Sequence, residues 1–241
     1  MATFRDKGLV LREHPAGERD KRLGLILLDR GRVTAFAKGA AAPASKFHAS
    51  AQTFAFSEFM FYEGPNYLTV AGCELVEGFH GVRRDFERLC LASHVLELAD
   101  RMLLENVACQ DELRLIYLAL GKLAGDYPPW LAAVVFELKL YQLAGFSPVS
   151  GRCHACEKPL RGGFFTYSGL TCDACAKNLP AVPVSPAAAH AISHILEADL
   201  KHLFAFTVAH DAVIEMVKAL DLFRRQILDY PPKSLSLLRA F

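Results

Sequence analysis

The sequence has no long apolar run. Although 52% of its 241 residues are hydrophobic, no stretch approaches the roughly 20 residues that a membrane-spanning helix needs. The start, Met1 to Asp6, lacks a signal-peptide core. We therefore expect a cytoplasmic protein with no membrane partner. The length suits one large domain or two to three small ones, and the apolar content is ample for buried cores.

Motifs for covalent chemistry are also missing. There is no glycine-rich phosphate loop, no Gly-x-Ser-x-Gly elbow and no His-Glu-x-x-His. A zinc deaminase would need a His-x-Glu before Cys153, and none occurs. His190 and His194 are four residues apart, a spacing that would suit a metal, but ordinary surface or core histidines explain them more simply. These absences argue against an enzyme.

The net charge is only +1, but the charges are unevenly distributed. Residues 1–50 carry ten Lys and Arg against five acids, whereas residues 51–100 carry three against eight. Such asymmetry favours a basic surface in the first fifty residues that meets a polyanion. The alternative is solvated surface charge without a common face.

The first 78 residues have a β pattern. We expect strands at residues 8–12, 23–28, 32–38, 53–62 and 67–76. In the fourth strand the apolar phase slips around Ser57-Glu58, which predicts a β-bulge that bends the strand. Short strands with one bend predict an α+β protein that begins with a five-stranded OB-like β-barrel over residues 1–79. An SH3-like barrel is the structural alternative.

From residue 79 the apolar period becomes helical. We expect helices at residues 85–107, 111–124, 130–144, 187–197 and 211–228. Asp85 is a candidate N-cap for the first, and Gly145 would end the third. These helices predict an α-helical domain made of residues 80–149 and 181–241.

Two Cys-x-x-Cys pairs, separated by fifteen residues, predict a structural zinc site. The expected ligands to one Zn²⁺ are Cys153, Cys156, Cys172 and Cys175. Four thiolates leave no open position for water, so the ion would be structural. The glycine and aromatic residues of 162–170 suggest a hairpin, and hence a zinc-ribbon-like four-cysteine module inserted at 150–180. Two disulfides or four unrelated buried thiols are the alternatives.

The order of several short motifs resembles the RecO family of recombination mediators, over nearly the whole chain. Those that carry the resemblance are Gly8-Leu9-Val10-Leu11-Arg12, Gly17-Glu18-Arg19-Asp20, Ala37-Lys38-Gly39, Pro43-Ala44-Ser45-Lys46, Phe136-Glu137-Leu138-Lys139-Leu140, Leu143-Ala144-Gly145-Phe146-Ser147-Pro148, the four cysteines, and Pro232-Lys233-Ser234.

The resemblance implies a DNA repair protein of the RecFOR pathway, associated with the nucleoid. Such a protein binds single- and double-stranded DNA, and anneals complementary strands coated by single-strand-binding protein. It joins RecR and thereby helps to load RecA. Annealing needs no covalent chemistry, in agreement with the missing catalytic motifs.

We predict phosphate contacts from cations at the barrel's strand ends and loops, with a second set in the helical region. The first set is Arg12, Lys21, Arg22, Lys38 and Lys46, and the second is Arg83, Arg84, Arg224 and Arg225. Phe4, Phe36 and Phe47 are candidates to stack on bases, or else core residues. A protein-interaction scaffold and an RNA-binding zinc-ribbon protein remain alternative functions.

Overall fold

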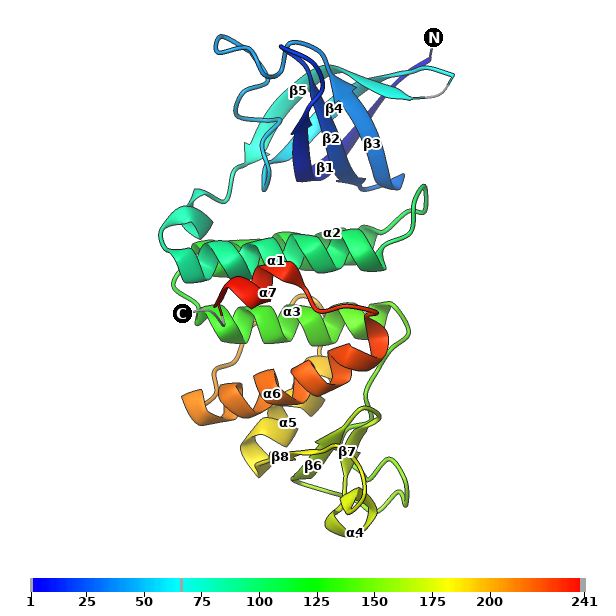
Figure 1. Cartoon of the computed structure of the whole chain (residues 1–241), viewed down its shortest axis with the longest axis vertical. Helices are drawn as coiled ribbons and strands as arrows, with labels where there is room; N and C mark the ends of the chain where they lie inside the picture. Colours follow the sequence, from blue (N-terminus) through cyan, green and yellow to red (C-terminus); the bar gives the residue numbers. More distant parts are fainter. Residues whose placement is uncertain (1, 66, 239–241) are drawn as a thin grey trace. The chain divides into compact units, whose positions relative to one another are not determined.

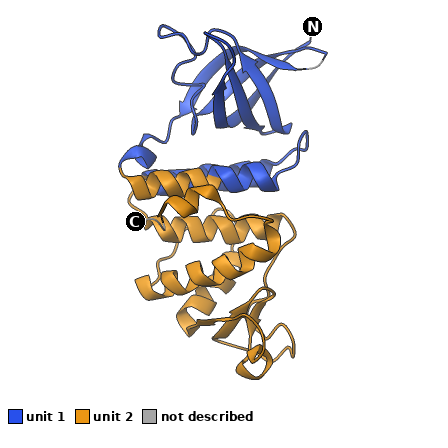
Figure 2. Ribbon diagram, viewed as in Figure 1, with its two compact units in different colours: residues 1–84, 96–124 blue, residues 85–95, 125–241 orange. Residues whose placement is uncertain are grey.

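The computed structural model describes residues 2–65 and 67–238. The chain divides into two compact units, coloured separately in Figure 2. The first unit is Met1–Arg84 with Leu96–Ala124, and the second is Asp85–Val95 with Gly125–Phe241. Within the described residues, no helix is both long and apolar enough to cross a membrane.

A closed five-stranded barrel forms the start of the first unit (Figure 1). Its strands are β1 (Ala2–Pro15), β2 (Lys21–Leu27), β3 (Gly31–Ala37), β4 (Phe56–Glu63) and β5 (Leu68–Glu77), in the order β1-β2-β3-β5-β4. The long β1 pairs with β4 through its first half and with β2 through its second, and β3 runs parallel to β5. This connectivity confirms the predicted OB-like barrel.

An irregularity occurs near the predicted place at the start of β4, but the prediction is wrong about which strand carries the bulge. The pairing of β4 with β5 shifts register between Phe56 and Ser57, and the extra residue there, Val76, belongs to β5. The Ser57 side chain is buried inside the barrel. The Phe56 ring points outward and packs against Tyr117, with ring centroids 5.1 Å apart. The slip in the apolar phase therefore marks a change of face where β4 begins.

The barrel interior is a continuous apolar core. Its buried members are Val10, Leu23, Leu25, Leu27, Val33, Ala35, Ala37, Ala40, Phe47, Ala51, Ala55, Phe59, Phe61 and Val70. Several of them come from the segment between β3 and β4, so this segment closes one end of the barrel. Phe47 is among them, which makes it a core residue and removes it from the candidates for base stacking.

The first two long helices agree in part with the pattern. α1 (Phe86–Met102) ends five residues before the predicted boundary, and α2 (Gln110–Ala124) begins one residue early. Asp85 is the N-cap of α1, since its Oδ1 accepts a hydrogen bond from the Arg88 backbone N–H at 2.8 Å. A short 3₁₀ helix, η1 (His80–Arg83), precedes α1.

The second unit is built around α3 (Pro129–Leu143), which is buried continuously from Leu131 to Tyr141. A helix that is buried on every side lies at the centre of its unit. It packs against α5 (Pro186–Glu197) and α6 (His210–Ile227). Gly145, with φ +87°, follows its end as predicted.

A small antiparallel sheet follows α3 in the chain. Its strands are β6 (Gly163–Thr166), β7 (Gly169–Thr171) and β8 (Val182–Val184), in the order β7-β6-β8, and the one-turn α4 (Asp173–Ala176) comes before β8 (Figure 1). The predicted hairpin is β6–β7. The pattern analysis missed β8 and the C-terminal α7 (Lys233–Leu238).

Candidate metal centre and nucleic-acid interface

The four predicted cysteine ligands come together in the second unit. Their sulfur atoms all lie within 4.8 Å of one another, and the Cys156 and Cys172 sulfurs are 3.8 Å apart. Four thiolates about 2.3 Å from a zinc ion would form a tetrahedron with edges of about 3.8 Å. The cluster therefore has the dimensions of a four-coordinate metal site.

Local backbone structure positions these thiols. The first pair lies in a turn whose His154 N–H donates to the Leu170 carbonyl of β7 at 2.8 Å. The second pair starts at Cys172, the residue that precedes α4. The Cys172 N–H also donates to the Cys153 sulfur at 3.4 Å. The hairpin thus holds the two Cys-x-x-Cys pairs close to each other.

The electrostatics of the cluster suit a cation. Burial would raise the pKa of Cys153, but backbone N–H groups, that of Cys172 first, lower it to about 6. Hydrogen bonds with the Cys172 and Cys156 sulfurs raise the pKa of Cys175 to about 12. Four sulfurs share one small space, and a bound cation would displace their protons. The four cysteines can therefore hold a metal ion.

Several barrel cations are paired with acids. Arg12 binds Asp100 at 2.9 Å, and its stem lies over Gly24. Lys21 is mostly buried and binds Glu13, whose other oxygen accepts the Thr53 N–H at 3.3 Å. Both were predicted phosphate contacts. Their charge is already compensated, so they are weaker candidates than the sequence suggested.

Other cations are exposed. Arg22, Lys38 and Lys46 have no carboxylate partner among the residues that the structure describes, and neither has Arg19 in the β1–β2 loop. The Arg19 carbonyl accepts the Ala41 N–H at 2.9 Å. That contact brings the loop beside the segment that follows Lys38. Arg19 was not singled out from the sequence, although its place in a glycine-containing loop was a usable signal.

Aromatic side chains accompany these cations on the outer face of the barrel. Arg22 in β2 lies directly opposite Phe36 in β3. The Phe36 and Tyr67 rings form a T-shaped pair, with ring centroids 5.5 Å apart. Tyr67 is 55% exposed. Phe36 therefore faces outward as a stacking residue would, whereas Phe4 stacks on Phe61, a core residue. Sequence reasoning missed Tyr67.

The second predicted set is heterogeneous. Arg83 is exposed, but its Nη2 donates to the Thr53 carbonyl at 2.9 Å and its guanidinium lies 5.3 Å from the Phe54 ring. Phe54 has φ +75°, a strained value for a bulky residue. Arg83 therefore holds a strained turn of the barrel in place. Arg84 is exposed.

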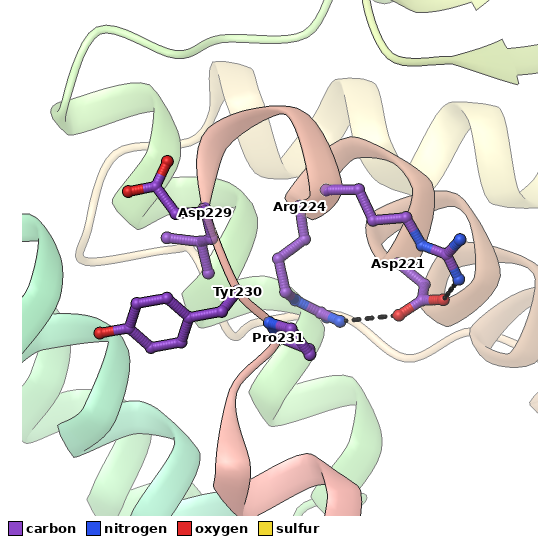
Figure 3. Close-up of a pocket in the computed structure, with 7 residues that line it drawn as sticks. Asp221, Arg224, Asp229, Tyr230 and Pro231 are labelled. Carbon is purple, nitrogen blue, oxygen red and sulfur yellow. Dashed lines mark hydrogen bonds and ion pairs between the residues drawn. The ribbon is translucent and has the colours of Figure 1, made fainter.

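The structure corrects the prediction that Arg224 contacts phosphate. This side chain is buried, with its Nε and Nη2 bound to Glu137 at 2.7 and 2.9 Å, so it cannot lie on a DNA-binding surface. Figure 3 shows the adjoining pocket, in which Asp221 also pairs with Arg224 and with the exposed Arg225, each at 3.1 Å. Asp229 and Tyr230 line the same pocket. The negative charges of the two aspartates in this pocket balance the positive charges of its two arginines.

The sequence analysis also missed the buried polar network around Glu137. This carboxylate accepts hydrogen bonds from Arg224, from the Tyr141 hydroxyl at 2.7 Å and, in the appropriate tautomer, from His94 at 3.1 Å. A network of this kind fixes α3 against α6. Its role is structural.

Together these features define a class of protein: an OB-like barrel with a basic and aromatic outer face, followed by a helical domain that carries a four-thiol cluster. Two family models match the chain. The model described as "Recombination protein O N terminal" matches residues 1–79, and "Recombination protein O C terminal" matches residues 83–236.

Relatives match over nearly the whole length. The DNA repair protein RecO of Desulforudis audaxviator is 30% identical over 243 residues, covering 99% of this chain and 97% of the relative. That of Acetivibrio thermocellus is 29% identical over 234 residues, covering 95% and 93%. That of Pelotomaculum thermopropionicum is 36% identical over 170 residues, covering 70% and 66%. The chain belongs to the RecO family.

Proposed function

We propose that this protein is a recombination mediator in DNA repair. It binds single- and double-stranded DNA without sequence preference and anneals complementary strands. With RecR, it helps to load RecA onto single strands coated by single-strand-binding protein. Family membership and relatives named DNA repair protein RecO support the repair role.

The observation that carries the proposal is the outer face of β2 and β3. Arg22 stands beside Phe36 and Tyr67 there, and exposed cations flank this face from the neighbouring loops. Cations give affinity for phosphates without reading sequence, and the affinity falls steeply with salt. Aromatic rings stack on any base. The strands 2–3 face is also where OB-folds bind oligonucleotides.

The remaining assignments follow from this proposal. The barrel of residues 1–79 binds DNA, a helical domain comprises 80–149 and 181–241, and residues 150–180 form a module held by one structural Zn²⁺. Annealing requires no covalent step, so the protein is not an enzyme. It works in the cytoplasm, at the nucleoid.

The test is strand annealing measured with and without single-strand-binding protein. The proposal predicts annealing of both naked and coated strands, and a direct interaction with RecR in a pull-down. No DNA binding at low salt, with RecR binding intact, would instead identify an interaction scaffold. Stronger competition by RNA than by DNA would identify an RNA-binding protein.

A further inference from the structure

A polar pocket of about 330 Å³ opens on the barrel within the first unit. β3 pairs with β5 through Ala35 and Phe36, whereas Arg32 bridges to Glu105, beyond the end of α1. Thr34 lies between these two pairings and lines the pocket. The pocket thus forms where β3 changes partner.

Two ion pairs supply its polar walls. Arg30 binds Glu63 at 2.8 and 3.4 Å, and the Arg32 Nη2 binds Glu105 at 3.1 Å. The Arg32 Nη1 is used outside the pocket lining, where it donates to the Asp100 carbonyl at 2.8 Å and to its carboxylate at 3.2 Å. Asp100 also binds Arg12, so three arginines face three carboxylates and their formal charges cancel. An isolated phosphate is therefore not the natural ligand. Each guanidinium has five N–H donors and each carboxylate about four acceptor sites, more than these pairs use. The Arg32 Nε is buried without a partner among the described residues.

The pocket also has an aromatic wall that it shares with the stacking face. Tyr67 lines the pocket and meets Phe36 edge-on. Thr34 and Phe36 are two residues apart in β3, on the same outer face as Arg22. A strand bound across Arg22 and Phe36 would therefore pass the mouth of the pocket.

We propose that this pocket binds one unpaired nucleobase of single-stranded DNA, a property that rests on the proposed function and refines it. A base is a neutral planar ring whose edge carries both hydrogen-bond donors and acceptors. A neutral site with guanidinium and carboxylate groups on its walls can satisfy any of the four bases, with Tyr67 against the ring. A base in a duplex enters only if it is unpaired and unstacked, which costs free energy. The pocket therefore favours single strands over duplex.

The experiment compares affinities of the full chain for a single strand, an abasic strand of equal phosphate number, and a duplex. Tyr67→Ala removes the aromatic wall, and Thr34→Phe fills the pocket while all four charged residues of its lining are kept. Both variants should bind the single strand about 5- to 150-fold more weakly, with unchanged affinity for duplex. Wild type should bind the abasic strand more weakly than the normal one, and Tyr67→Ala should narrow that difference.

Two controls separate the possible outcomes. Tyr67→Phe keeps the ring and should bind like wild type, as should Tyr230→Ala, which removes a similarly exposed tyrosine of the second unit. Thermal unfolding checks that each variant folds. Unchanged single-strand affinity in both pocket variants, or an equal loss for single strand and duplex, overturns the base pocket but leaves DNA binding standing. If wild type binds no DNA at low salt, the proposed function fails first.

Discussion

Arg224 in α6 and Glu137 in α3 form a buried ion pair, with Nε and Nη2 of the arginine 2.7 and 2.9 Å from the two carboxylate oxygens. The pair joins two helices of the second unit. Arg224→Ala would leave a buried carboxylate without its main partner, so we predict a loss of about 3–5 kcal/mol in the free energy of unfolding. Urea denaturation measures it. Arg225→Ala, at the exposed neighbouring residue, should change stability by less than about 0.5 kcal/mol; equal losses would contradict the assignment.

The same carboxylate makes stability depend on acid. Burial alone would raise the pKa of Glu137, but Arg224 and His94 outweigh it and lower the pKa to about 2, from 4.5. Because the folded-state pKa is depressed, the contribution is fully present above pH 4.5 and is lost as pH falls toward 2. Urea unfolding across this range should show a steeper decline in the free energy of unfolding for wild type than for Glu137→Gln. Parallel curves for the two proteins would refute the prediction.

Two neighbouring cations of β2 should behave differently. Lys21 is paired with Glu13, whereas Arg22 is exposed beside Phe36. Lys21→Ala should lower the free energy of unfolding by about 1–2 kcal/mol and leave the salt dependence of DNA binding unchanged. Arg22→Ala should leave stability unchanged and reduce the slope of log affinity against log salt by roughly 0.7 for single strands. Denaturation and DNA-binding titrations on both variants test these two roles. A stability loss in Arg22→Ala with a reduced salt slope in Lys21→Ala would contradict them.

Metal content tests the cysteine cluster. Protein purified without chelator should contain one zinc ion per chain, and removal of the metal should lower the thermal midpoint, because metal binding contributes folding free energy. Cys175→Ser should lose the metal. Cys73→Ser, outside the cluster, should retain it. Zinc-free protein with an unchanged midpoint would show that the four thiols hold no metal.

The parts of the fold that sequence predicted are those governed by local patterns. Alternating apolar residues identified the barrel strands, and Asp85 and Gly145 fixed helix ends through short-range backbone contacts. The strand β8 escaped because Pro183 interrupts it, and proline suggests a break. In the structure β8 is an edge strand, where proline is tolerated.

The candidate site was less predictable, because ion pairing is set by tertiary structure. Nothing local indicates that Arg12 meets Asp100, or that Arg32 meets Glu105. One available signal was overlooked. Arg224 lies four residues after the buried Leu220 and so falls on the apolar stripe of α6, where a cation needs a buried partner. The four cysteines, by contrast, were predictable because the Cys-x-x-Cys spacing is a local sequence pattern typical of metal sites.

The central claim is that exposed cations on the barrel bind the DNA backbone. It is tested most directly by the affinity for single-stranded DNA at several salt concentrations, in wild type and in Lys38→Glu/Lys46→Glu. Phosphate contacts by four exposed cations, Arg19, Arg22, Lys38 and Lys46, predict that log affinity falls against log salt with a slope of roughly −3 in wild type. The loss of two contacts predicts a slope of roughly −1.5 or shallower. Lys201→Glu/Lys218→Glu, which reverses two exposed cations of the second unit, should keep the wild-type slope. A slope identical in all three proteins would contradict the claim.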